Sequence, residues 1–156
     1  MSGYVICGLD PALFQGLYGL TEAELAERKI FRRTADSVPG FPCRVTLQDA
    51  DVGDTLLLLN WEHLPVASPY RSSHAIFVRE GATEAAEYRS EVPLLLRRRL
   101  ISLRAFDAAD MMIAAEVLDG EQLADAITDG LGNPAVAYLH AYNAKRGCFA
   151  ARIDRA

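Results

Sequence analysis

The sequence predicts an α+β fold, a mainly antiparallel sheet of about six strands with two or three helices packed against it. Short apolar segments of strand length follow one another and are separated by brief polar links, a pattern typical of antiparallel sheets. Two segments carry helix signals, a capping box at Thr21 and Glu24 and a helical spacing of apolar residues from Leu123 to Leu131. The chain has 156 residues, 51% of them hydrophobic and 24% charged. This size and composition predict one domain over residues 1–156.

In the first half, Tyr4 to Leu9 is a short apolar run that predicts an edge or entry strand. The capping box predicts a helix from Thr21 to about Phe31. Two prolines and a glycine in Ser37 to Pro42 exclude helix or central strand there. Further elements are expected as strands at Arg44 to Leu47, Thr55 to Glu62 and His74 to Arg79, and as a short helix at Ala82 to Tyr88.

The second half contains two predicted hairpins with a helix between them. Leu100 to Phe106 and Met111 to Leu118 flank a short polar connection, so they are expected to pair as antiparallel strands. Asp119 is expected to cap the helix that contains Leu123 to Leu131, and glycines and a proline end it. The last predicted strands are Ala135 to Tyr142 and Cys148 to Asp154.

Composition excludes several classes of partner. The formal net charge is -5 and acidic residues surround most basic ones, so nucleic acid is not expected as a partner. No apolar run approaches the roughly 20 residues of a membrane helix, and the start lacks a signal-peptide pattern, which predicts a cytoplasmic protein without membrane contact. A homodimer is one open possibility if Tyr4 to Leu9 or the final strand forms an exposed sheet edge. Three cysteines are expected as free thiols, although a Cys43–Cys148 disulfide stays open.

The C-terminal hairpin holds the first candidate site. If Tyr142 pairs with Cys148 across a five-residue loop, His140 and Cys148 share one face at roughly 7–8 Å between Cα atoms. If Asn143 pairs with Cys148 instead, the two side chains lie on opposite faces. In the first register, His140 and the nearby Arg152 would favour a thiolate at Cys148, which would make that cysteine a candidate nucleophile. Otherwise Cys148 is a small core residue and His140 a hydrogen-bonded one.

Arginines within apolar, strand-like segments form the second candidate site. Arg71, Arg104 and Arg152 each need a carboxylate, a carbonyl or a bound anion if they are buried. Their convergence would create an anion site, whereas pairing with internal acids such as Glu62 or Asp154 would make them structural. A metal site is not expected, because no two histidines or cysteines have the spacing of a ligand pair. No cofactor-binding motif occurs either.

An ordered series of motifs carries a family resemblance: Phe41-Pro42-Cys43-Arg44, Pro69-Tyr70-Arg71-Ser72, His74-Ala75-Ile76-Phe77-Val78, Leu103-Arg104-Ala105-Phe106, and His140-Ala141-Tyr142-Asn143 to Gly147-Cys148-Phe149-Ala150-Ala151-Arg152-Ile153. With these motifs the chain resembles the bacterial domain of unknown function 1203 family over nearly its whole length. The resemblance brings no established activity. It draws attention to polar residues in the motifs, which are Cys43, Arg71, His74, Arg104, His140, Asn143, Cys148 and Arg152. One departure is Val45-Thr46-Leu47, where the family pattern often has a second cysteine, and this counts against a metal or redox pair at Cys43.

Three functions remain open from the sequence. The leading hypothesis is a site for a small anionic molecule, held by Arg71, Arg104 and Arg152 with His74, His140 and Cys148 beside it. The first alternative is a non-catalytic interaction or structural protein whose arginines form internal salt bridges. The second is an enzyme with Cys148 as nucleophile and His140 as base.

Overall fold

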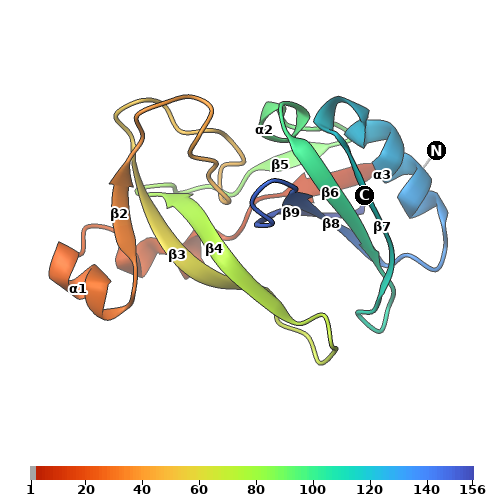
Figure 1. Ribbon diagram of the computed structural model, residues 1–156, viewed down its shortest axis with the longest axis horizontal. Coiled ribbons are helices and arrows are strands. Elements are labelled where there is room, and N and C mark those ends of the chain that lie inside the picture. The colour runs from red at the N-terminus through yellow and green to blue at the C-terminus, as the bar shows by residue number, and fades with distance from the viewer. Residues whose placement is uncertain (1–2) are drawn as a thin grey trace.

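The computed structural model describes residues 3–156 and contains two antiparallel sheets (Figure 1). The strands are β1 (Tyr4–Cys7), β2 (Phe31–Thr34), β3 (Thr55–Leu64), β4 (Ser72–Arg79), β5 (Glu87–Arg89), β6 (Leu100–Phe106), β7 (Met112–Asp119), β8 (Tyr138–Asn143) and β9 (Phe149–Arg155). The α-helices are α1 (Glu22–Glu27), α2 (Leu94–Arg97) and α3 (Leu123–Gly132), and short 3-10 turns cover Pro11–Leu13, Gln15–Leu17 and Gly120–Gln122. The predicted α+β class with an antiparallel sheet of six strands is confirmed.

The six-stranded sheet has the order β5-β1-β9-β8-β6-β7, and the smaller sheet has the order β2-β3-β4. The predicted hairpin of β6 and β7 is confirmed by direct pairing from Leu100 opposite Asp119 to Phe106 opposite Met112. The expectation that the first or the final strand forms an edge is wrong. Strand β1 pairs with both β5 and β9, and β9 lies between β1 and β8. The edges of this sheet are β5 and β7.

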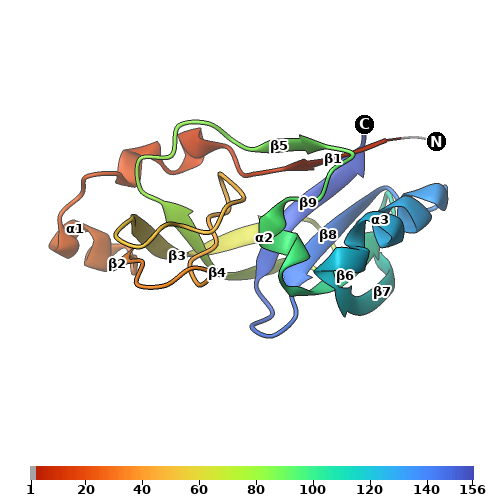
Figure 2. The same cartoon turned by 90° about the horizontal axis from the view of Figure 1, so that it is seen from above.

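Helices α2 and α3 cover one face of the six-stranded sheet (Figure 2). Leu95 and Leu96 of α2 and Ile127 of α3 belong to one large buried cluster, which also holds Ile101 of β6 and Ile153 of β9. A second cluster lies under the smaller sheet and includes Phe14, Leu25, Val45, Leu57 and Ile76. Each fully buried side chain of this size contributes about 1.5–3 kcal/mol. The opposite face of the six-stranded sheet carries neither of these two helices (Figure 2).

Helix α1 begins as predicted and ends earlier than predicted. The Thr21 hydroxyl accepts a hydrogen bond from the Glu24 amide at 3.2 Å, and the Glu24 carboxylate accepts one from the Thr21 amide at 2.8 Å. The helix stops at Glu27 because Lys29 takes a left-handed conformation with φ of 58°. Strand β2 follows at Phe31, inside the range expected to be helical.

Two further predicted elements are wrong. Arg44 to Leu47 forms a turn, in which the Leu47 amide donates to the Cys43 carbonyl at 3.0 Å. Ala82 to Tyr88 is extended and leads into β5, because Ala86 bonds to other segments, accepting from the Gly8 amide and donating to the Val45 carbonyl. A Cβ atom at Gly8 would lie 1.9 Å from the Val45 carbonyl oxygen, so this close approach requires glycine.

The side chain of Asp119 makes no capping bond. It precedes the 3-10 turn, and α3 itself begins only at Leu123. Within residues 3–156, none of the helices has the length and apolar character needed to cross a lipid bilayer.

Candidate functional site

Six rings from both sheets form an aromatic cluster on the sheet face that α2 and α3 leave open. The members are His63 of β3, Phe106 of β6, Tyr138, His140 and Tyr142 of β8, and Phe149 of β9. Residues 138, 140 and 142 share one face because side chains alternate along a strand. The Phe149 ring is central, with its centroid 5.0 Å from the rings of both His63 and His140. The cluster therefore joins the smaller sheet to the larger one.

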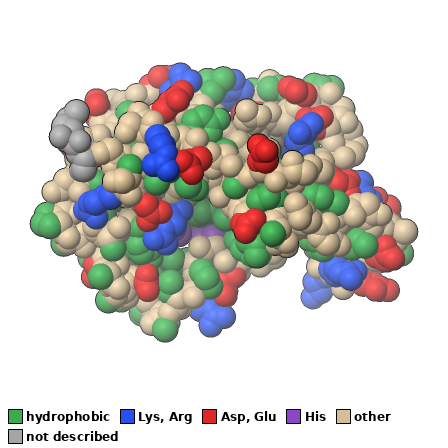
Figure 3. Space-filling model, turned by 180° about the vertical axis from the view of Figure 1, so that it is seen from behind, with side chains coloured by type: hydrophobic (Ala, Val, Ile, Leu, Met, Phe, Trp, Pro, Cys, Tyr) green, Lys and Arg blue, Asp and Glu red, His purple; other side chains and the backbone are tan. Residues whose placement is uncertain are grey.

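The surface above this cluster is hollowed. Figure 3 shows histidine side-chain atoms at the bottom of a depression, with Lys or Arg atoms beside them. The three histidines of the chain are His63 on β3, His74 on β4 and His140 on β8. The histidine atoms visible there accordingly belong to β3, β4 or β8. The surface around the contact between His63 and Tyr142, whose ring centroids lie 5.4 Å apart, is called the recess below.

Three residues that were selected from the sequence form a row across the floor of the recess. Arg104 of β6 lies directly opposite His140 of β8, and His140 lies directly opposite Arg152 of β9. Directly opposed residues share a face of the sheet, so all three side chains start from the same side. The row thus holds two of the three arginines whose convergence was expected, Arg104 and Arg152, while Arg71 pairs with Glu62 instead.

The hairpin register separates His140 from Cys148. The Asn143 amide donates to the Cys148 carbonyl at 2.9 Å, and a bulge between Ala141 and Tyr142 then shifts the pairing so that Tyr142 lies opposite Phe149. Phe149 shares the face of His140, so its neighbour Cys148 lies on the other face. The geometry does not place His140 as a base for the Cys148 thiol.

Hydrogen bonds link the polar atoms of the recess in two pairs. The Ser72 hydroxyl and His63 Nε2 share a hydrogen bond of 3.1 Å, and the Tyr142 hydroxyl and His140 Nδ1 share one of 3.2 Å. Nδ1 of His63 is buried and has no hydrogen-bond partner among the described residues.

Both histidines of the cluster are neutral at physiological pH. Burial lowers the pKa of His140 to about 3, and the nearby His63, Arg152 and Arg104 lower it further. Burial also lowers the pKa of His63 to about 4, partly opposed by the Trp61 carbonyl. Burial raises the pKa of Tyr142, which Arg104 partly offsets. The row therefore carries positive charge only on its two arginines.

The three predicted anion-binding arginines differ in their partners. Arg71 pairs with Glu62 at 2.9 Å on the surface, and Arg152 pairs with Asp154 at 2.9 Å while its guanidinium lies 4.1 Å from the Tyr138 ring centroid. Arg104 forms no ion pair with any residue from 3 to 156. Its guanidinium lies 3.9 Å from the Tyr142 ring centroid, and its Nε donates to the Ser102 hydroxyl at 3.2 Å. Arg104 is thus the arginine left available for a ligand.

Cys148 and Asn143 belong to a separate buried cluster around Arg44. Arg44 is 2% exposed and donates to the carbonyls of Phe149 at 2.7 Å and Pro42 at 2.5 Å. It also donates to the Cys148 sulfur at 3.1 Å, and the Asn143 side-chain amide donates to the same sulfur at 3.4 Å. Burial lowers the pKa of Arg44. This cluster has the contacts of a structural element that fixes the hairpin against the loop before β3.

Cys43 and His74, the remaining candidates, lie apart from the row. The Cys43 sulfur is buried and accepts from the amides of Thr46 at 3.4 Å and Arg79 at 3.2 Å. His74 lies on β4, where its Nδ1 approaches the Ala75 carbonyl at 3.1 Å. All three cysteines are free thiols. Nowhere in residues 3–156 do three or more His, Cys, Asp or Glu side chains gather as metal ligands.

Sequence reasoning did not select His63, Ser72, Tyr142 or Arg44 as site residues. Tyr142 could have been found, since it follows His140 by two residues and shares its face. Arg44 lies between Cys43 and Val45 in an apolar segment, which is the same signal that singled out the other arginines. His63 and Ser72 reach the recess from the smaller sheet, and no local pattern indicates that contact.

Comparison with known proteins gives a family without an activity. A family model described as protein of unknown function (DUF1203) matches residues 40–155, which hold the row, the aromatic cluster and Arg44. No curated protein and no solved structure matches the chain. The match covers well over half of the sequence, and the chain therefore belongs to the DUF1203 family.

Proposed function

We propose that this protein binds a small molecule through an anionic group, a carboxylate or a phosphate, at Arg104 in the recess. The observation that carries the proposal is the guanidinium of Arg104, which is partly buried and has no carboxylate partner among residues 3–156. A partly buried arginine without a counter-ion attracts an anion more strongly than an exposed one, because less water screens it.

The surroundings of Arg104 suit an anion. Tyr142 offers a hydroxyl group near it, whereas the Ser72 hydroxyl already donates to the Tyr70 carbonyl at 2.9 Å. The neutral His63 and His140 add no charge of their own. The acids of the recess lie at its other end, where Asp110 accepts from the Tyr138 hydroxyl at 2.7 Å and Asp154 pairs with Arg152. A ligand carboxylate at Arg104 would therefore meet hydrogen-bond donors before it meets negative charge.

The guanidinium carbon of Arg104 lies 3.9 Å from the Tyr142 ring centroid, and this contact limits the movement of its donors. The planar guanidinium fork matches the two oxygens of a carboxylate or phosphate. Benzoate and inorganic phosphate are the two simplest probes of this chemistry.

The ion pairs of Arg71 and Arg152 favour a second candidate function, a non-catalytic structural or interaction protein. Both arginines satisfy their charge inside the chain, so neither requires a ligand. In this alternative Arg104 is satisfied by Tyr142, the Ser102 hydroxyl and water. The two candidates differ in what replacement of Arg104 does to anion binding.

The proposal is tested by titrating benzoate and inorganic phosphate into the protein and following backbone and arginine Nε resonances by NMR. We expect shifts at Arg104, Tyr142 and Ser72. Arg104→Gln should weaken the binding of the responsive probe at least roughly tenfold, because a charge-assisted bidentate contact is worth about 1.5–3 kcal/mol. Arg104→Lys should restore only part of it, since the ammonium lacks the planar fork.

Arg71→Gln is the matched control. It removes an equally charged side chain that is already paired with Glu62 on the surface, so probe affinity should change less than twofold. Binding that survives Arg104→Gln unchanged, or the absence of any probe-dependent shift at the recess, would reject the anion site.

A further inference from the structure

Arg44 is a buried arginine that has no carboxylate partner among residues 3–156. Its side chain lies in the segment between β2 and β3, it is 2% exposed, and it forms no ion pair with any described residue. Burying a guanidinium is costly unless an opposite charge and hydrogen bonds compensate for the lost water. Burial lowers the pKa of Arg44, and the largest opposing effect comes from Cys148. The charge of Arg44 therefore needs an anion other than an aspartate or a glutamate.

The sulfur of Cys148 lies where such an anion is needed. It accepts from Arg44 Nη2 at 3.1 Å and from Asn143 Nδ2 at 3.4 Å, so two N–H donors converge on it. A neutral thiol is a weak acceptor that also carries a proton of its own, whereas an ionised acceptor forms stronger hydrogen bonds. A cationic side chain next to a cysteine also favours its thiolate. The two donors therefore suit an ionised sulfur.

The carboxamide of Asn143 is oriented for the same charge state. Asn143 is 8% exposed, and its Oδ1 has no hydrogen-bond partner among the described residues. A neutral Cys148 could donate its S–H group to that oxygen if the carboxamide were turned over. The carboxamide instead presents its N–H group to the sulfur. This is the orientation that a thiolate requires, because a negative sulfur would repel Oδ1.

We propose that Cys148 is ionised in the folded chain and that its thiolate is the counter-ion of Arg44. This buried charge pair would join the hairpin of β8 and β9 to the segment between β2 and β3. It goes beyond the anion site at Arg104 and does not depend on it, because Cys148 lies on the sheet face opposite to that of His140 and Arg104.

The other titratable groups that act on Arg44 are Arg99 and Cys43. Arg99 adds positive charge, and its own acid partner Asp49 is bonded to it at 2.5 Å. The Cys43 sulfur acts on Arg44 in the same direction as Cys148, but it accepts from two backbone amides. Cys148 is therefore the cysteine that bonds to the guanidinium directly.

The charge of Cys148 can be measured in the wild-type protein by NMR. Cysteine labelled with carbon-13 at Cβ gives a signal whose chemical shift differs between thiol and thiolate, and backbone resonances assign it to a residue. We expect the Cys148 signal to have the thiolate shift at about pH 6, where an unperturbed cysteine, with a pKa of about 8.5, is protonated. Cys7 is the control in the same spectrum, because burial, Glu87 and Asp154 raise the pKa of its thiol. The Cys7 signal should have the thiol shift at that pH.

Two substitutions of nearly equal size at Cys148 give a second measurement. Cys148→Asp keeps an anion beside Arg44, whereas Cys148→Asn offers an oxygen without the charge. Cys148→Asp should therefore unfold at a higher urea concentration than Cys148→Asn at about pH 7. Cys7→Asp and Cys7→Asn are the matched pair at an exposed position near Glu87 and Asp154, where Asp should have no such advantage.

A Cys148 signal with the thiol shift at about pH 6 would overturn the proposal. So would a Cys148→Asn variant that is at least as stable as Cys148→Asp. The labelled wild type carries no substitution, so the NMR measurement decides the charge of Cys148 even if its variants do not fold.

Discussion

His140 is a neutral imidazole held in the aromatic cluster, with 1% of its surface exposed. Five rings lie around it at centroid distances of 5.0–6.2 Å, those of His63, Phe106, Tyr138, Tyr142 and Phe149. No acid forms an ion pair with it in residues 3–156, so protonation inside the fold would leave a buried charge uncompensated. The residue therefore resists protonation as long as the chain is folded.

This resistance predicts acid sensitivity. Since the pKa of His140 is about 3 in the folded chain and about 6.5 in the unfolded chain, the unfolded state binds more protons between these values. Stability should therefore fall as the pH falls below 6.5, by about 2 kcal/mol from pH 7 to pH 5 for this residue. His140→Gln should lose this part of the pH dependence, measured as the free energy of urea unfolding at both pH values.

His74→Gln serves as the control for that experiment. His74 lies on β4 outside the aromatic cluster, so the comparison shows whether the loss of pH dependence is specific to the buried histidine. If His140→Gln retained the full wild-type difference between pH 7 and pH 5, the neutral buried state of His140 would be contradicted.

At the residue scale, sequence alternation could predict part of the site. The two-residue period of a strand places Tyr138, His140 and Tyr142 on one face of the sheet. The family motifs add Arg104 and Arg152 as candidate site residues. The register of the β8–β9 hairpin could not be predicted from the sequence, because a bulge of one residue decides which face of the sheet Cys148 takes. Such a bulge depends on the packing of both strands, which local sequence does not contain.

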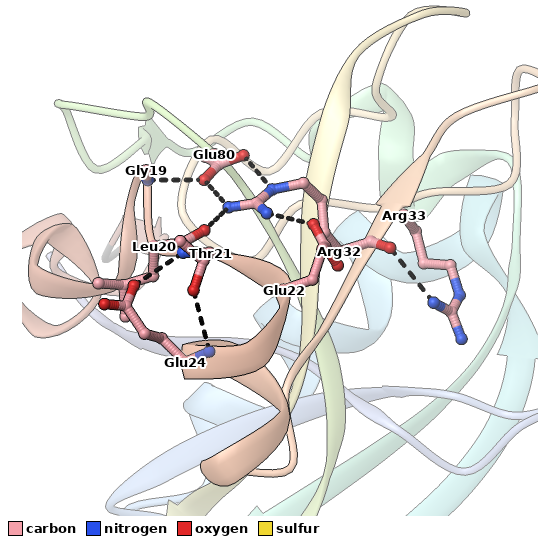
Figure 4. A network of polar contacts seen from close by, with 8 residues as sticks. All are labelled: Gly19, Leu20, Thr21, Glu22, Glu24, Arg32, Arg33 and Glu80. Carbon is pink, nitrogen blue, oxygen red and sulfur yellow. Dashed lines mark hydrogen bonds and ion pairs between the residues drawn. The ribbon is translucent and has the colours of Figure 1, made fainter.

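Arg32 of β2 is the residue that ties several short elements together (Figure 4). Its guanidinium donates to the Glu80 carboxylate at 2.9 and 2.8 Å, to the Leu20 carbonyl at 2.7 Å, and to Glu22 of α1. Glu80 also accepts from the Gly19 amide at 2.9 Å, and the bond from Arg32 lowers its pKa. A six-residue helix has little stability of its own, so this network holds α1 in place.

We expect Arg32→Gln to reduce the free energy of unfolding by clearly more than a change at an exposed arginine does, because it leaves the partly buried Glu80 without its cation. Arg33→Gln is the neighbouring control. Arg33 is exposed and its side chain bonds to the Arg32 carbonyl at 3.2 Å, so its replacement should cost under about 0.5 kcal/mol. Urea titrations of both variants make the comparison, and equal losses would argue against the network.

Local sequence signals predicted the start of helix α1 better than its end. The capping box at Thr21 placed the start of α1 because its bonds join residues three apart. The end was missed because Lys29 adopts a conformation that its residue type does not indicate. Ala82 to Tyr88 has helical composition, yet Ala86 bonds to Gly8 and Val45, which lie far away in sequence.

The two sheets meet in the middle of the molecule, and Phe149 is the side chain at their junction. It is 3% exposed, its ring stacks on His63 of β3, and its carbonyl accepts from the buried Arg44. The six-stranded sheet was expected, but the second sheet was not, since strand pairing between distant segments leaves no local trace. The stability of the whole molecule should therefore depend on the packing of Phe149 at this junction.

Phe149→Ala should reduce the free energy of unfolding by about 3–5 kcal/mol, as for other large-to-small substitutions in a core. Phe31→Ala removes the same ring from a side chain that is 50% exposed, and it should cost under about 1 kcal/mol. Differential scanning calorimetry would report both as shifts of Tm. A small effect at Phe149 would mean that the sheets are held together elsewhere.

The position of β9 between β1 and β8 has a consequence for how the chain is made. Of the strands described, β9 is translated last, yet it supplies the central partner of the first strand, with Tyr4 opposite Arg155. The guanidinium of Arg44 likewise gains one of its hydrogen bonds only after Phe149, 105 positions later, has been synthesised. During synthesis the early strands must remain open to solvent and to chaperones until β9 leaves the ribosome. The large sheet can close only after translation of this segment is complete, and its long-range pairing should make closure slow.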